Sequence, residues 1–194
     1  MENKLKILIT GVAGYVGAML IDQFADRDDV EKIVAIDKEE RSDLDSENPK
    51  VIFIQKNLAY NWEEDLAKIG DNGFEPDVVI HTAWQIREMY GQKDKQWDWN
   101  INGSDKVFDY AFSTPSVKKL IHFSTVASYS ARPDNSLDHY FTEEEPFRKS
   151  DYLYAEEKRI CEKHLEEKYA AAKESAKILG ENTPQVFIIR PAAI

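Results

Sequence analysis

The stretch Thr10-Gly11-Val12-Ala13-Gly14-Tyr15-Val16-Gly17 decides the fold. Gly11 permits a tight turn, Gly14 lets the backbone approach a pyrophosphate, and Gly17 allows a helix to pack closely on a strand. The free N–H groups and partial positive charge at the start of that helix favour an anion. The stretch follows a short apolar run and opens an apolar pattern with helical spacing. It therefore predicts a dinucleotide-binding turn.

Asp37 supplies the acid that such a turn requires further along the chain. It ends the second predicted strand, twenty residues past Gly17. A carboxylate there accepts hydrogen bonds from both hydroxyls of an adenosine ribose and repels a 2′-phosphate, which favours NAD over NADP. Lys38 and Arg41 lie nearby and would weaken that preference. The predicted cofactor is NAD.

Strands and helices alternate along the remaining sequence. Apolar runs predict strands at residues 6–9, 33–36, 51–54, 78–80, 120–123 and 186–189, and helical patterns fall at residues 15–24, 62–69, 97–112 and 151–179. Continuous apolar strands between helices indicate a parallel sheet covered on both faces. We therefore predict one α/β domain over residues 1–194: a Rossmann-type doubly wound parallel sheet in three layers, with strand order 3-2-1-4-5-6.

Tyr154 and Lys158 stand four residues apart near the start of the last predicted helix, so they share one helix face. A neighbouring cation favours the ionised form of a phenol and lowers its pKa. Such a tyrosine can exchange a proton with a carbinol or carbonyl oxygen. Tyr152 lacks such a partner, because Glu156 follows it at the same spacing.

Together these motifs resemble the extended branch of the short-chain dehydrogenase/reductase family, the NAD-dependent epimerase/dehydratase group. The resemblance covers nearly all of residues 5–194. It rests on the glycine turn, Asp37, His81-Thr82-Ala83, Asn100-Ile101-Asn102-Gly103-Ser104, Phe123-Ser124-Thr125, Tyr154-x-x-x-Lys158 and Arg190-Pro191.

The resemblance implies a catalytic group. Tyr154 would be the general acid/base, and Lys158 would lower its pKa and hydrogen-bond the nicotinamide ribose. Thr125, preceded by Ser124, would hold the reacting oxygen. Asn100 would keep a helix bend and a water in place, although a purely structural amide is an equal alternative.

The resemblance also implies the cofactor contacts. Asn57 and Leu58 would face the adenine, with asparagine standing where the family usually has aspartate. Thr82, Ala83 and Trp84 would line the nicotinamide half, with Trp84 standing where a small residue is usual. The remaining predicted contacts are Gly11, Val12, Ala13, Gly14, Tyr15, Val16, Gly17, Asp37, Tyr154, Lys158 and Pro191.

The predicted function is an NAD-dependent enzyme of the epimerase/dehydratase type. It would act on an alcohol or ketone, and the resemblance implies a nucleotide-sugar substrate. The tail of the Ser/Thr motif, Ser128-Tyr129-Ser130, departs from the usual Val-Tyr-Gly, so the substrate stays open. Family members continue into a substrate domain, which we expect to be missing here. The alternatives are a non-catalytic, redox-sensing dinucleotide-binding module and a fragment that binds NAD without turnover.

The amino-acid composition limits the classes of binding partner that are expected. Acidic residues outnumber basic ones by 36 to 25, giving a net charge of −11, so nucleic acid and anionic membranes are not expected partners. The sole cysteine, Cys161, excludes an internal disulfide. The sequence shows no secretory start and no apolar run near the ~20 residues that cross a bilayer, so a cytoplasmic protein is expected. Helices resembling residues 97–112 and 152–169 often form homodimers in the family.

Several other residues have two interpretations. His81 is predicted to serve packing, and His122 and His139 lack neighbours at metal-ligand spacing, so no metal is expected. The aromatic residues Tyr90, Trp97 and Trp99 either pack or stack on a sugar or base. The polar stretch 134–148 is predicted to be a surface loop that could act as a lid.

Overall fold

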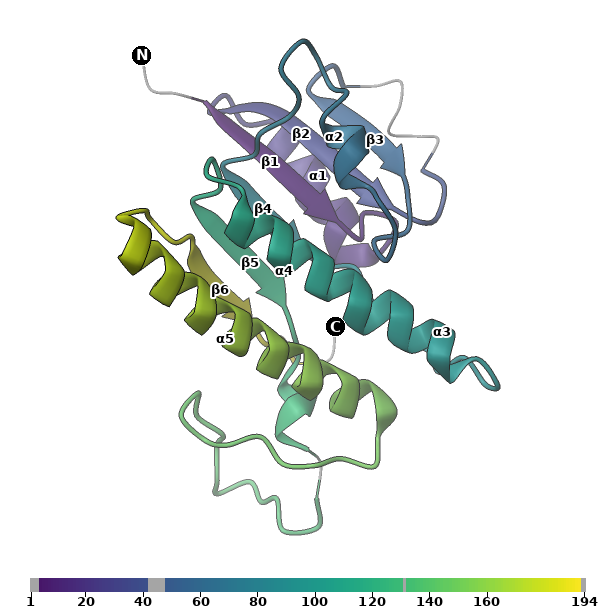
Figure 1. Cartoon of the computed structure of the whole chain (residues 1–194). Helices are drawn as coiled ribbons and strands as arrows, with labels where there is room; N and C mark the ends of the chain where they lie inside the picture. The colour runs from purple at the N-terminus through teal and green to yellow at the C-terminus, as the bar shows by residue number, and fades with distance from the viewer. Residues whose placement is uncertain (1–3, 42–47, 131, 193–194) are drawn as a thin grey trace.

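One parallel sheet dominates the computed structural model, which describes residues 4–41, 48–130 and 132–192. Its order is β3-β2-β1-β4-β5-β6 (Figure 1), and every neighbouring pair is parallel. The predicted fold class, strand order and strand positions are confirmed. The strands are β1 (Leu5–Thr10), β2 (Val30–Asp37), β3 (Val51–Gln55), β4 (Val78–His81), β5 (Lys119–Phe123) and β6 (Gln185–Ile189).

The helices follow the predicted positions with two differences. The helices are α1 (Tyr15–Ala25), α2 (Glu63–Leu66), α3 (Lys93–Trp97), α4 (Gly103–Ser113) and α5 (Leu153–Leu179). The helix predicted over residues 62–69 is a single turn, because the chain then continues in tight turns and reverses at Gly70, whose φ is +67°. The helix predicted from residue 97 begins at Lys93, and a π-helical segment, Asp98–Asn102, joins α3 to α4.

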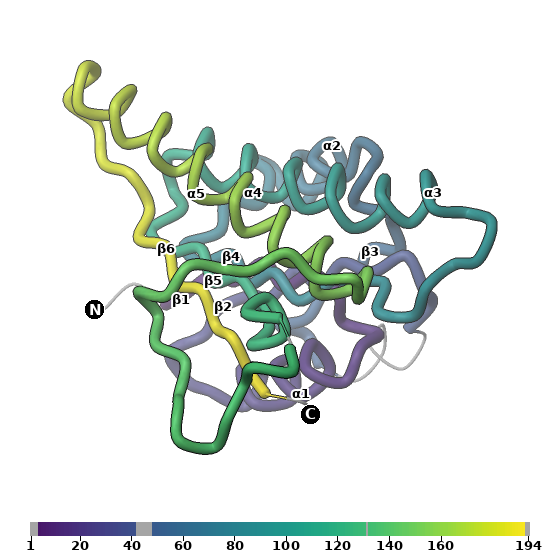
Figure 2. Tube along the Cα trace, turned by 90° about the horizontal axis from the view of Figure 1, so that it is seen from below, coloured from purple at the N-terminus to yellow at the C-terminus, as the bar shows by residue number. Residues whose placement is uncertain are grey.

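Side chains alternate between the two faces of the sheet. Leu8 packs with residues of α2, α4 and α5, whereas Ile7 and Ile9 pack with residues of α1. Figure 2 shows the same division, with α2, α4 and α5 on one side of the sheet and α1 on the other. Burial of apolar side chains on both faces is what the unbroken apolar strands predict.

The carboxyl ends of the parallel strands share one edge of the sheet, which is where ligands bind in such folds. The glycine turn leaves β1 at this edge, and a short 3-10 helix, Val126–Tyr129, follows β5 there. Residues 132–150 form a long irregular segment beyond the ends of β5 and β6 (Figure 1). Over the described residues, no helix combines the length and apolarity needed to span a bilayer.

Candidate functional site

The glycine turn brings the backbones of β1, β4 and α1 close together. Gly11 has a φ of +82°, and a Cβ built on it would lie 2.3 Å from the amide nitrogen of Ala83. A Cβ on Gly17 would lie 2.3 Å from the carbonyl oxygen of Gly11. Only glycine therefore fits at either position, and the N-terminus of α1 stays open beside the turn.

The crowding at Gly17 predicts a measurable loss of stability. Gly17→Ala should lower the free energy of unfolding by about 1–3 kcal/mol, because backbone atoms cannot yield to a new methyl group as a flexible side chain can. Urea denaturation followed by circular dichroism measures it. Gly103→Ala is the milder control, since its Cβ would lie 3.3 Å from the Cβ of Leu58 and 3.4 Å from the amide nitrogen of Ala59, so the neighbours need to shift by only a few tenths of an ångström. Equal stability of the two variants would contradict the packing argument.

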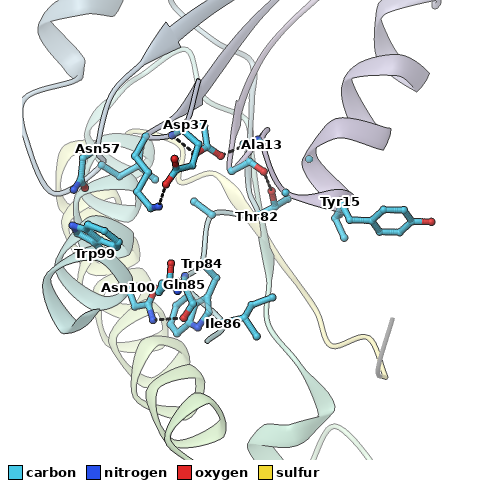
Figure 3. A pocket seen from close by; sticks show the side chains of 18 of the residues that line it. Ala13, Tyr15, Asp37, Asn57, Thr82, Trp84, Gln85, Ile86, Trp99 and Asn100 are labelled. Carbon is cyan, nitrogen blue, oxygen red and sulfur yellow. Dashed lines mark hydrogen bonds and ion pairs between the residues drawn. The ribbon is translucent and has the colours of Figure 1, made fainter. Parts of the chain in front are cut away.

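Asp37 faces the glycine turn from the end of β2. Its Oδ2 accepts a hydrogen bond from the backbone N–H of Ala13 at 2.9 Å (Figure 3), and its Oδ1 accepts one from the N–H of Glu39 at 2.9 Å. Arg41 donates to the carbonyl oxygen of Val12. These contacts fix the carboxylate beside the turn, as the spacing from Gly17 predicts.

A cavity of about 730 Å³ lies over this edge of the sheet. Its lining contains most of the predicted cofactor residues: Gly11, Ala13, Gly14, Tyr15, Val16, Gly17, Asp37, Asn57, Leu58, Thr82, Ala83 and Trp84. Val12 is fully buried in the core beneath the turn, and the side chain of Tyr15 points away from the cavity (Figure 3). Tyr154, Lys158 and Pro191 lie outside the lining.

Six lining residues were not among the predicted site residues: Lys38, Glu39, Lys56, Gln85, Ile86 and Trp99. Lys38 and Lys56 could have been predicted, because they directly follow and precede the predicted cofactor contacts Asp37 and Asn57 in the sequence. Trp99 comes from the π-helical segment, and the ammonium groups of Lys38 and Lys95 lie 4.4 Å and 4.8 Å from its ring centroid. Of the three aromatic candidates for stacking, Trp99 is the one in this cavity lining.

Tyr154 and Thr125 meet beyond the ends of β4 and β5. Thr125 caps the short 3-10 helix, accepting from the N–H of Ala127 at 3.2 Å. Burial raises the pKa of the Tyr154 phenol, and a side-chain hydrogen bond with Thr125 opposes that rise. The direction is opposite to the lowering expected from Lys158. The ammonium of Lys158 is directed at other groups, so burial dominates.

Lys158 is 3% exposed. Its Nζ donates to the carbonyl oxygen of Phe123 at 2.7 Å and lies 3.8 Å from the centroid of the Trp84 ring. Burial lowers the pKa of Lys158 to about 8, with Cys161 and Glu162 acting in the opposite direction. The ring of Trp84 also meets the ring of Tyr154 edge-on, with centroids 6.5 Å apart. Trp84 thus links the cavity to the pair of Tyr154 and Lys158.

Asn100 lies inside the π-helical segment, where the resemblance predicts a bend. Its amide is fully engaged: Oδ1 accepts from the N–H of Gln85 at 2.7 Å, and Nδ2 donates to Glu157 at 2.7 Å and to the Gln85 carbonyl at 3.0 Å. Gln96 donates to the same Glu157 oxygen at 3.1 Å. Asn100 therefore ties α5 to the cavity wall. The sequence did not predict the role of the buried Glu157, because a charged residue in a charged helical stretch is normally expected to face solvent.

Ser124 is placed by another buried carboxylate. Its hydroxyl donates to Glu162, which also receives the guanidinium of Arg190 at 2.7 Å. Pro191 contributes through its backbone, since its carbonyl oxygen accepts from the N–H of Val126 at 3.1 Å. Ser124 and Pro191 therefore support the segment carrying Thr125 and do not line the cavity.

His81 is buried, as a residue that serves packing would be. Its ring nitrogens bond Thr10 at 2.7 Å and Ser104 at 2.8 Å, and burial lowers its pKa to about 3. Tyr152, the tyrosine without a cationic partner, is 59% exposed. Among the described residues, no group of three or more His, Cys, Asp or Glu side chains is arranged to hold a metal ion.

Comparison with known proteins gives one family match and many similar folds. A family model described as the NAD dependent epimerase/dehydratase family matches residues 7–181. The Bordetella bronchiseptica enzyme WbmG in complex with NAD is 23% identical, with a TM-score of 0.71 over 97% of this chain. The enzyme WbmH of the same organism, in complex with NAD+, is 26% identical, with a TM-score of 0.66 over 85% of this chain.

A third similar structure is a UDP-glucuronic acid 4-epimerase from Bacillus cereus in complex with UDP-glucuronic acid and NAD. It is 19% identical, with a TM-score of 0.69 over 96% of this chain. The present chain covers 53% of WbmG, 53% of WbmH and 56% of the epimerase, so it spans about half the length of the proteins it matches.

Proposed function

This chain belongs to the NAD dependent epimerase/dehydratase family, within the extended short-chain dehydrogenases/reductases, and we propose that it is the NAD-binding portion of an enzyme acting on an alcohol or ketone. One observation carries the proposal. The ring of Trp84, which lines the cavity together with the glycine turn and Asp37, contacts both Lys158 and Tyr154, and Tyr154 shares a hydrogen bond with Thr125. A dinucleotide site next to a proton-transfer group is the requirement for hydride chemistry at a carbinol carbon.

The residues of the cavity fit the adenosine diphosphate half of NAD. Glycine at positions 11 and 17 lets the turn pack closely against the chain after β4 and against α1, and the start of α1 would receive the pyrophosphate. Asp37 would accept from the ribose hydroxyls. Asn57 and Leu58 would border the adenine, and Thr82 and Ala83 would lead toward the nicotinamide. Bound NAD would supply the hydride acceptor.

The catalytic roles follow from the side chains nearest the reacting oxygen. The hydroxyl groups of Tyr154 and Thr125 would hold that oxygen between them, and Tyr154 would take or give the proton. Lys158 would hold the nicotinamide ribose and keep a positive charge near the phenolate. Ser124 and Asn100 would act through their hydrogen bonds, by fixing Thr125 and the cavity wall.

The proposed substrate is a nucleotide-sugar. The similar structures include a dTDP-glucose 4,6-dehydratase in complex with NAD and the UDP-glucuronic acid 4-epimerase described above. Epimerisation and dehydration both begin with oxidation of a sugar hydroxyl, which the group of Tyr154 and Thr125 would support.

We keep a second proposal: these residues bind NAD without turning a substrate over. The chain covers only about half of each similar protein, so the activity of the whole protein stays a proposal for this chain. A purely redox-sensing module is the weaker variant of this proposal, because a sensor has no need for Tyr154 and Lys158 together.

Titration with NADH and NADPH tests the cofactor site. Binding should quench the tryptophan fluorescence, since Trp84 and Trp99 line the cavity. NADH should bind more tightly than NADPH, because Asp37 would repel a 2′-phosphate. Asp37→Asn should weaken NADH binding by about 10- to 100-fold, because the ribose hydroxyls lose a charged acceptor. The control is Asp22→Asn, on the exposed side of α1. Tighter binding of NADPH by the parent chain would overturn the choice of NAD.

A further inference from the structure

Trp84 contacts both the cavity and the buried lysine. It is one of the residues lining the cavity, and the Lys158 Nζ lies 3.8 Å from its ring centroid. That separation places the ammonium directly over the π-face, well inside the ~6 Å limit of a cation–π contact. A small residue at this position would leave the ammonium without this contact.

The surroundings of Lys158 offer little else to stabilise its charge. One N–H donates to the Phe123 carbonyl oxygen at 2.7 Å, and no carboxylate forms an ion pair with Lys158 in the described part of the chain. His81 on β4 and His122 on β5 face it, and burial lowers the pKa of both, so they stay neutral near pH 7. The other titratable groups that act on it are Cys161 and Glu162 on α5, and the Glu162 carboxylate is already paired with Arg190.

No hydrogen bond within the described part of the chain fixes the indole of Trp84, so its position depends on contacts made by the ring. Its Nε1 is buried and has no hydrogen-bond partner among the described residues. The specific contacts of the ring are therefore the ammonium of Lys158 and the edge-on ring of Tyr154, both on the first turns of α5. A phenylalanine at position 84 would keep an aromatic face and remove the unpartnered N–H.

We propose that Trp84 is the positioning residue of Lys158: its π-face holds the ammonium against the Phe123 carbonyl oxygen and favours the charged form of the lysine. The importance of this for catalysis rests on the proposed function, in which Lys158 serves Tyr154 and the nicotinamide ribose. The contact itself belongs to the free chain. Burial lowers the pKa of Lys158 to about 8, with Cys161 and Glu162 opposing the fall. The aromatic face of Trp84 favours the charged form as well.

The test is the pKa of Lys158 in the full chain, measured by NMR titration of lysines labelled at Cε and assigned with Lys158→Met. Trp84→Leu should lower that pKa by about one unit, and Trp84→Phe by clearly less, because phenylalanine keeps a weaker π-face. Trp97→Leu is the control, since Trp97 is 40% exposed, and the pKa should not move. Neither cofactor nor substrate is present, so the result is independent of whether the chain is an enzyme.

An unchanged or raised pKa in Trp84→Leu would overturn the proposal, since it would mean that water solvates the ammonium as well as the indole does. Equal pKa values in the Leu and Phe variants would also overturn it. If the Leu variant does not fold, Trp84→Phe decides: a pKa below that of the parent supports the proposal, and an equal or higher one rejects it. NADH titration of the same variants reports separately on the cofactor site.

Discussion

Glu162→Ala is expected to lower the free energy of unfolding by about 3–5 kcal/mol, the range found when one partner of a buried ion pair is removed. The side chain of Glu162 is fully buried, and that of Arg190 is 16% exposed. The free energy of unfolding of a folded domain is only about 5–15 kcal/mol, so this single change would remove a large part of the stability of the domain.

The size of the effect follows from the number of groups that Glu162 serves. Its two oxygens accept from the Nε and Nη2 of Arg190 and from the hydroxyl of Ser124. Arg190 continues the network, donating to the Tyr129 hydroxyl at 3.3 Å and lying over the ring of Phe147 at 4.9 Å. Without the carboxylate, a guanidinium would stay buried without its counter-charge.

Urea denaturation gives the measurement, and the same helix offers the control. Glu167 pairs with Lys163 on the surface of α5, with side-chain exposures of 63% and 65%. Glu167→Ala should change the stability by less than about 1 kcal/mol. The double variant Glu162→Met with Arg190→Met should recover most of the loss, since it leaves no charge unpaired. If Glu162→Ala proves as mild as Glu167→Ala, the buried network does not stabilise the fold.

Local patterns in the sequence were sufficient to predict the sheet. Each strand is a short apolar run bounded by polar or glycine residues, and the spacing of Gly11, Gly14 and Gly17 ties the first strand to its helix. Helix boundaries were less predictable, because they depend on contacts made elsewhere. The start at Lys93 and the π-helical segment around Asn100 coincide with bonds from Gln96 and Asn100 to Glu157 on another helix.

The candidate site also contains residues that could be predicted from the sequence and residues whose roles depend on the fold. Gly11, Asp37, Tyr154 and Lys158 are recognisable from residue type and spacing, and Thr125 from the resemblance to the family, so all five could be proposed from the sequence. Glu157 and Glu162 look like any other acids on a charged helix until folding buries them. The direction of the Tyr154 pKa shift also depends on three-dimensional placement: burial raises that pKa, and the Lys158 ammonium is directed at the Phe123 carbonyl oxygen and the Trp84 ring.

Tyr154→Phe is expected to reduce turnover by about 10²–10⁴-fold, the usual contribution of a positioned general acid or base. The substitution removes only the hydroxyl, so the ring contact with Trp84 and the binding of NADH should persist. The assay incubates the chain with NAD and a panel of UDP- and TDP-sugars and separates the sugar products by chromatography, because epimerisation and dehydration return the hydride to the sugar and leave no net NADH. Tyr152→Phe is the matched control, since that exposed tyrosine lies two residues upstream and should leave the rate unchanged.

The outcomes of this comparison separate the two proposals for the chain. Equal rates in the Tyr154 and Tyr152 variants would remove Tyr154 from its role. A parent chain that binds NADH and transforms none of the sugars would favour NAD binding without turnover. A large loss confined to Tyr154→Phe would locate the chemistry where Thr125, Tyr154 and Trp84 meet, because no other described tyrosine hydroxyl pairs with Thr125. The Tyr154 phenol would then need the positive charge of Lys158, and the aromatic face of Trp84 would support catalysis by favouring that charge.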